Sequence, residues 1–136
     1  MPKRPGARIT KGFAAFTVAA AATGALLVSA PTASAAGYLN ACLSEVGQTQ
    51  APNGMWVPAG NFAMGSSGNC VREIQENLLR YFPLTSWERG NGDFVDGQFG
   101  YRTDSAVRRM QEQYRLEVDG IVGPRTWSVL LSLASG

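Results

Sequence analysis

The side chains that could do chemistry in this chain of 136 residues are ten carboxylates, two cysteines and twelve Lys or Arg, and there is no histidine. Without an imidazole the chain cannot form a Ser-His-Asp or Cys-His site, a histidine-ligated zinc site or a histidine general base. Two cysteines are too few for a zinc site built from three or four thiolates. We therefore expect no metal and no cofactor.

Pairs of carboxylates are the one catalytic arrangement that this composition leaves open. A glycosidase can work with two carboxylates about 5–5.5 Å apart when it retains configuration, or about 6.5–9.5 Å apart when it inverts. Helical spacing predicts that Glu73 and Glu76 lie on a helix surface, and the turns described below account for Asp96 and Asp119. We therefore expect no enzyme, although six acids could form pairs: Glu73, Glu76, Glu88, Asp93, Asp96 and Asp119.

The two cysteines, Cys42 and Cys70, predict a disulfide if the chain is exported, because an exported pair in an oxidising compartment usually forms one. Their spacing is not that of a C-x-x-C redox pair. Closing this loop would stabilise the fold by roughly 3–4 kcal/mol, if the bond acts by restricting the unfolded chain.

The N-terminal 35 residues indicate export. A basic start with two Lys and two Arg precedes an uncharged, Ala-rich stretch over residues 12–30, and Ala33-Ser34-Ala35 is an A-x-A cleavage pattern. The alternative is a membrane anchor, since a bilayer needs about 20 apolar residues, but this stretch is mostly Ala with Gly, Ser and Thr. We expect a signal peptide over residues 1–35, cleaved after Ala35 or Ala36, and no stable membrane insertion afterwards.

Cleavage changes the charge of the chain. The full sequence has a net charge of +2, whereas residues 36–136 contain eight Arg, no Lys and ten carboxylates, which gives −2. Guanidinium groups suit bidentate contact with carboxylate or phosphate. This balance gives no reason to expect nucleic acid as a partner, and 101 residues allow one small core. We expect a secreted monomer.

Three helices must position any site in the second half, because apolar residues recur there at steps of three and four. They are expected over residues 70–82, 101–115 and 124–134. Their apolar faces carry Val71, Ile74 and Leu78, then Ala106, Val107 and Met110, then Trp127, Leu130 and Leu131. Residues 36–67 are interrupted by Gly and Pro, which predicts a loop-rich extension with a short helix or strand over 38–46 and a short strand over 55–57.

An internal repeat connects these helices. The segments DGQFGYRT (96–103) and DGIVGPRT (119–126) match at Asp, both Gly, Arg and Thr. Asp-Gly predicts a tight turn in which the carboxylate accepts local N–H bonds and Gly has a positive φ. The fourth residue, Phe99 or Val122, enters the core, and the second Gly stands at a helix N-cap. The turn residues are Asp96, Gly97, Gly100, Asp119, Gly120 and Gly123.

These motifs resemble the peptidoglycan-binding domain found beside catalytic domains in bacterial cell-wall hydrolases. The resemblance covers residues 68–133 and is carried by GNCVREIQENLLR at 68–80, both repeat turns, Ala106-Val107, Gln111 and Trp127. It implies an all-α, compact three-helix fold over residues 68–136 with two pseudo-symmetric turns. It also implies association with the cell wall through affinity for peptidoglycan, commonly for its stem peptides.

Exposed Arg beside aromatic rings would hold the free carboxylates and amides of stem peptides. The stretch 83–95 is longer than is usual in the family and adds further candidates. The expected ligand-binding residues are Tyr101, Arg102, Arg125, Trp87, Arg89 and Asn91. The alternative is a secreted interaction partner or inhibitor that docks on a separate cell-wall hydrolase through Trp56 or Trp87.

Overall fold

The structure is a computed structural model that describes the backbone from residue 30 to residue 136 and the side chains from residue 38. Residues 1–29 of the signal peptide predicted over residues 1–35 lie outside the described residues. Residues 37–136 form one compact unit, and before it only the helical backbone of residues 30–36 is described. Across the described range, no helix combines the length and the apolar character that crossing a membrane requires.

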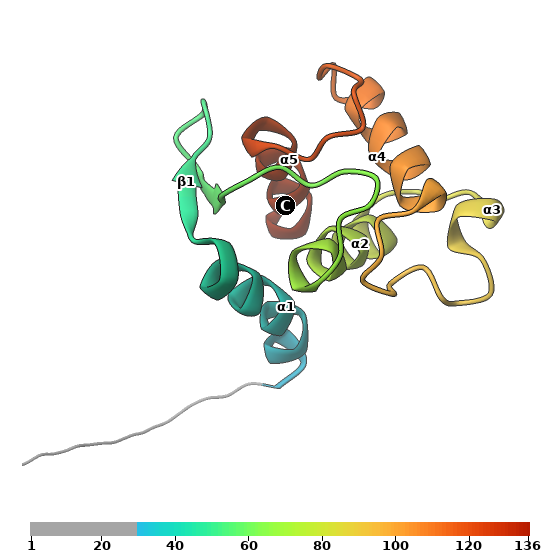
Figure 1. The fold of residues 1–136 in the computed structure, drawn as a ribbon, viewed down its shortest axis with the longest axis horizontal. Helices are drawn as coiled ribbons and strands as arrows, with labels where there is room; N and C mark the ends of the chain where they lie inside the picture. The colour runs from blue at the N-terminus through green and yellow to red at the C-terminus, as the bar shows by residue number, and fades with distance from the viewer. Residues whose placement is uncertain (1–29) are drawn as a thin grey trace, which may run out of the picture. The chain divides into compact units, whose positions relative to one another are not determined.

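The described chain is mostly helical, as predicted, with one small hairpin (Figure 1). In chain order its elements are α1 (Ala30–Val46), β1 (Gln48–Gln50), β2 (Trp56–Pro58), α2 (Asn69–Tyr81), α3 (Ser86–Arg89), α4 (Tyr101–Gln113) and α5 (Pro124–Ser135). Helices α2, α4 and α5 start within one residue of the three predicted helices. The choice left open for residues 38–46 is resolved as helix α1, β2 matches the predicted short strand, and α3 is an addition.

The core lies where α2, α4 and α5 meet. Phe99 and Val122, the apolar residues of the two repeat turns, are buried beside them. Trp127 is fully buried in α5, and the Phe62 ring meets it edge-on at 6.1 Å between centroids. The helices contribute Val71, Ile74, Leu78, Ala106, Val107, Met110 and Leu130, all fully buried.

The segment before α2 joins this unit at several places. The predicted disulfide is confirmed, since Cys42 in α1 is bonded to Cys70 in α2. Strands β1 and β2 form an antiparallel hairpin. After the hairpin, Phe62 pairs with Val122 in the second repeat turn, and Ser67 pairs with Gln98 in the first. The chain between β2 and α2 therefore runs along both turns (Figure 1).

Glu73 corrects the prediction that this residue lies on a helix surface. Helix α2 is covered on more than one side, so that seven of its 13 residues are buried, and Glu73 is only 5% exposed. The Asn77 amide donates to its Oε2 at 3.1 Å, whereas its Oε1 has no partner among the described residues. Burial disfavours the charged carboxylate and raises the pKa of Glu73 to about 7.

Glu73→Gln is expected to stabilise the fold at pH 8 by about 2 kcal/mol and to have little effect at pH 4.5. A raised folded-state pKa favours the native state below the unfolded pKa of about 4.5, and this contribution is lost as the pH rises through 7. Thermal unfolding at both pH values measures the effect, with the exposed Glu112→Gln as control. Equal shifts at both pH values would contradict the assignment.

Candidate ligand-binding site

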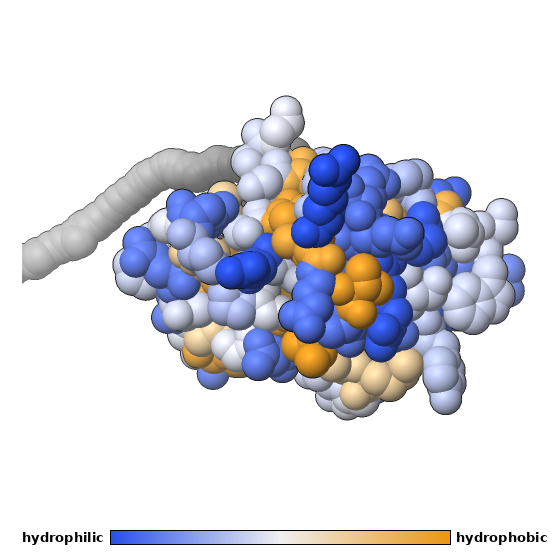
Figure 2. Space-filling model, turned by 90° about the horizontal axis from the view of Figure 1, so that it is seen from above, coloured by the Kyte–Doolittle hydropathy of each residue, from blue (hydrophilic) through white to orange (hydrophobic). Residues whose placement is uncertain are grey.

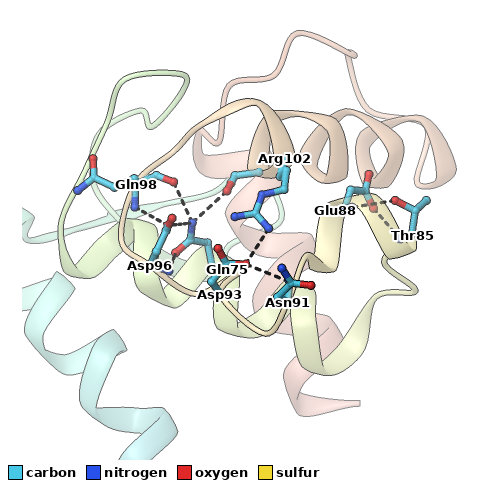
Figure 3. Close-up of polar contacts among 9 residues, drawn as sticks. Gln75, Thr85, Glu88, Asn91, Asp93, Asp96, Gln98 and Arg102 are labelled. Carbon is cyan, nitrogen blue, oxygen red and sulfur yellow. Dashed lines mark hydrogen bonds and ion pairs between the residues drawn. The ribbon is translucent and has the colours of Figure 1, made fainter.

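The first repeat turn is held from inside by the side chain of Gln75 in α2, which is fully buried. Its Nε2 donates to Asp96 Oδ1 at 2.9 Å, to the Gln98 carbonyl at 3.0 Å and to Thr103 Oγ1 at 3.0 Å. Its Oε1 accepts from the backbone N–H of Asp96 at 3.0 Å and of Gly97 at 2.8 Å. One amide thus satisfies polar groups along the whole turn (Figure 3).

Gln111 in α4 holds the second turn in the same way and is 1% exposed. Its Nε2 lies 3.0 Å from Asp119 Oδ1, 3.0 Å from the Ile121 carbonyl and 3.2 Å from Thr126 Oγ1. Its Oε1 accepts from the N–H of Asp119 and of Gly120 at 3.1 and 3.0 Å. We call Gln75 and Gln111 the two clamp glutamines.

The local geometry of both turns follows from their residue types. Gly97 and Gly120 have φ of +77° and +74°, which residues with a Cβ rarely adopt. The carboxylates of Asp96 and Asp119 accept from the N–H two residues ahead, each at 2.9 Å. The second glycines, Gly100 and Gly123, are the N-caps of α4 and α5, and Pro124 is the first residue of α5.

A groove of about 350 Å³ opens beside the first turn. Its rim carries Trp87 from α3 and Tyr101 from α4, which are 60% and 78% exposed. The residues that line it are Trp87, Phe94, Asp96, Gln98, Gly100, Tyr101, Arg102 and Thr103. We call it the first groove. It brings together three of the six predicted ligand-binding residues.

Arg102 forms an ion pair with the inserted stretch, residues 83–95. Its Nη1 donates to Asp93 Oδ1 at 2.9 Å, and Asp93 also accepts from the N–H of Asn91 at 3.3 Å (Figure 3). This hydrogen bond to Arg102 lowers the pKa of Asp93. The guanidinium lies so close to Gly90 that a Cβ there would meet it at 1.9 Å. Arg102 therefore braces the groove wall.

The inserted stretch is anchored to α4 by Glu88 and Arg109. Glu88 is 0% exposed and accepts from Arg109, from Ser105 Oγ at 2.7 Å and from the Thr85 N–H at 2.9 Å. The Glu88 N–H in turn donates to Thr85 Oγ1 at 3.1 Å, which completes a capping box at the start of α3. Burial alone would raise the pKa of Glu88, but these bonds outweigh it and lower the pKa to about 2.

Arg109→Met is expected to lower the free energy of unfolding by about 2–3 kcal/mol at pH 7, since it leaves a buried carboxylate without its cation. The wild-type contribution of Glu88 is present above pH 4.5 and is lost as the pH falls towards its folded pKa of about 2. Denaturant unfolding across this range tests the pair, and the variant should lose less stability on acidification. Parallel pH profiles would show that the pair is not coupled.

A second groove of about 750 Å³ lies beside the second turn. It is bounded by the hairpin loop, the chain before α2, the end of α4 and the start of α5. Its lining residues are Gln50, Pro52, Asn61, Leu116, Glu117, Asp119, Ile121, Gly123, Pro124, Arg125 and Thr126. Arg125 is the predicted ligand-binding residue that this groove contains. Arg89 and Asn91, the remaining two, line neither groove.

Apolar side chains also reach the surface outside the core. The face seen in Figure 2 carries orange apolar patches bordered by hydrophilic residues. Trp56 in β2 is as exposed as Trp87, at 60%, but it lines neither groove. The six acids that could have formed a catalytic pair are all hydrogen-bonded within the fold. Their partners are Asn77 for Glu73, Arg80 for Glu76, Arg109 for Glu88, Arg102 for Asp93, Gln75 for Asp96 and Gln111 for Asp119.

The fold and its two clamped turns define a small helical module built from two turn–helix repeats. Residues 67–130 match the family described as "Putative peptidoglycan binding domain". The zinc D-Ala-D-Ala carboxypeptidase of Streptomyces albus G is 38% identical over 106 residues, which are 78% of this chain and 36% of that protein. The chain thus spans about a third of that enzyme's length. The chain belongs to the peptidoglycan-binding domain family.

Two further relatives extend the comparison. An uncharacterized protein encoded in the bpoA1 3' region of Kitasatospora aureofaciens is 33% identical over 113 residues, covering 83% of this chain and 88% of that protein. The crystal structure of the SleB N-terminal domain is 31% identical and covers 56% of this chain and 94% of that chain, with a TM-score of 0.45. A match of 113 residues within 136 must extend through the segment that precedes residue 67.

Proposed function

We propose that this chain is exported and acts as a non-catalytic module that binds the stem peptides of bacterial peptidoglycan in the cell wall. In this proposal residues 1–35 are removed after Ala35 or Ala36. The extension over residues 36–67 and the domain over residues 68–136 then form the working protein, a monomer whose ligand-binding residues are those that face the grooves.

The observation that carries this proposal is the family match over residues 67–130, because that segment forms most of both grooves. The first groove exposes the aromatic faces of Trp87 and Tyr101, and the second exposes Arg125. Concave sites of this volume, with a few polar groups among apolar ones, are typical of ligand binding. The relatives that are named as hydrolases are longer than the part that matches, so their activities are not carried over.

A non-catalytic role is supported by the hydrogen bonds that already occupy the carboxylates. A glycosidase needs one carboxylate free to protonate a leaving group and a second free to attack or to activate water. Asp96 and Asp119 each accept from a clamp glutamine, and Glu88 is held by Arg109. Incubating residues 36–136 with labelled peptidoglycan should therefore release no soluble fragments. Release above that of a heat-unfolded sample would overturn the non-catalytic assignment.

The double variant Trp87→Ala/Tyr101→Ala is expected to reduce co-sedimentation with purified sacculi by about tenfold, since it removes both exposed aromatic faces of the first groove. The matched control is Trp56→Ala, which removes an equally exposed indole outside both grooves. Both variants should unfold within a few degrees of the wild type, because surface substitutions change stability little. Equal losses in both variants would point to general stickiness of exposed tryptophan rather than to the groove.

A further inference from the structure

The two grooves occupy equivalent places in the repeat. Six positions of the repeat that line the first groove line the second one as well, each 23 residues further along the chain. Four of these positions carry the same residue type in both grooves: Asp96 and Asp119, Gly100 and Gly123, Arg102 and Arg125, and Thr103 and Thr126. The other two carry different types, Gln98 against Ile121 and Tyr101 against Pro124. Any difference in what the grooves bind must come from the two unlike pairs, from the lining residues outside the repeat, or from what the identical residues contact.

The two arginines at the shared position are in different states. Arg102 is held by Asp93 at 2.9 Å, and its side chain is only 28% exposed. Arg125 is exposed and makes no ion pair or side-chain hydrogen bond with any residue from 38 to 136. An arginine without a partner keeps its full fork of donors for a carboxylate, whereas a paired one must first give up its partner.

The residues that complete the walls of the two grooves also differ, and they make the second groove the more polar one. The first is completed by the rings of Trp87 and Phe94, and the second contains no aromatic residue. Asn61 forms a polar wall of the second groove and lies so close to Gly123 that a Cβ there would meet its Oδ1 at 2.8 Å. Glu117, which follows the end of α4, is an exposed carboxylate that could pair with an amine. The second groove is thus the more polar of the two, and it holds an arginine without an ion-pair partner among residues 38–136 together with an exposed carboxylate.

From this contrast we infer that the second groove is the site for the carboxylate-bearing part of the stem peptide, with Arg125 as the residue that binds the carboxylate. The inference rests on the proposed function and refines it. Asn61 contacts the peptide amides, and Glu117 takes the side-chain amine. The extension before residue 67 is therefore part of the binding site, because Gln50, Pro52 and Asn61 form one of its walls.

The test is an NMR titration of residues 36–136 with the synthetic peptide L-Ala-γ-D-Glu-L-Lys-D-Ala, and with the same peptide carrying both carboxylates as amides. We expect amide shifts in residues 117–126 and at residues 50 and 61, with the free-acid peptide bound about tenfold more tightly than the diamide. Arg125→Gln should weaken binding of the free acid by about tenfold and leave binding of the diamide unchanged.

The matched control is Arg80→Gln, which removes a guanidinium on α2 outside both grooves and should bind like the wild type. A second variant, Asn61→Asp, places a negative charge in the groove and should weaken binding of the free acid more than that of the diamide. The inference is overturned if the shifts map to residues 87–103, if Arg125→Gln binds the free acid normally, or if no shift occurs up to about 10 mM. If sacculi are bound in any of these cases, the proposed function survives without this assignment.

Discussion

Gln75→Glu and Gln111→Glu are each expected to lower the free energy of unfolding by about 4 kcal/mol at pH 7, and the thermal midpoint by about 20 °C. The substitution keeps the shape of the side chain but replaces its only donor with an acceptor. In Gln75→Glu a carboxylate oxygen would face Asp96 Oδ1, which now lies 2.9 Å from the amide nitrogen. It would also face the Gln98 carbonyl and Thr103. The repulsion acts in a buried site, where it is weakly screened.

The control for both variants is Gln113→Glu, which makes the same chemical change at an exposed residue of α4. It should shift the midpoint by no more than a few degrees. Acidification should partly restore Gln75→Glu and Gln111→Glu, because a protonated carboxyl can donate again. If either variant unfolds like the control, the clamp glutamines do not hold the turns.

Removing the disulfide with Cys42→Ala/Cys70→Ala is expected to cost about 3–4 kcal/mol, since the bond closes a long loop in the unfolded chain. The bond links α1 to α2, and both cysteines are buried. Because it positions the extension that carries Asn61, reduction should also weaken sacculus binding. Denaturant unfolding with and without reductant measures the first effect, and sedimentation measures the second.

The internal control is the double variant itself, whose stability and sacculus binding should not respond to reductant. A wild type that unfolds at the same denaturant concentration in both redox states would contradict the stabilising role. Unchanged sedimentation after reduction would show that the extension does not depend on the bond for its place in the binding site.

The helices and the turn geometry could be predicted because local sequence determines both. Asp-Gly fixes the sign of φ, and apolar spacing fixes the buried face of each helix. The clamp glutamines could not be assigned in this way, although a signal for them exists. Gln75 and Gln111 each continue an apolar stripe, next to Ile74 and Met110, where a buried polar residue requires partners. Only the fold shows that those partners lie 21 and 8 residues away.

The site was harder to predict than the fold, because its walls come from segments that the repeat does not contain. Arg102 and Arg125 occupy equivalent positions in the sequence, yet only Arg102 meets an acid. The acid that it meets belongs to the inserted stretch, whose position depends on the buried contact between Glu88 and Arg109. Tertiary contacts of this kind leave no local pattern, which is also why helical spacing wrongly predicts Glu73 at the surface.

The most direct measurement is co-sedimentation of residues 36–136 with purified, protein-free sacculi. We expect saturable binding that soluble peptidoglycan fragments compete away, that Arg125→Gln and Trp87→Ala/Tyr101→Ala weaken, and that Trp56→Ala leaves unchanged. If the folded wild type stays in the supernatant at every sacculus concentration, the wall-binding function is wrong and docking on a separate hydrolase becomes the better hypothesis.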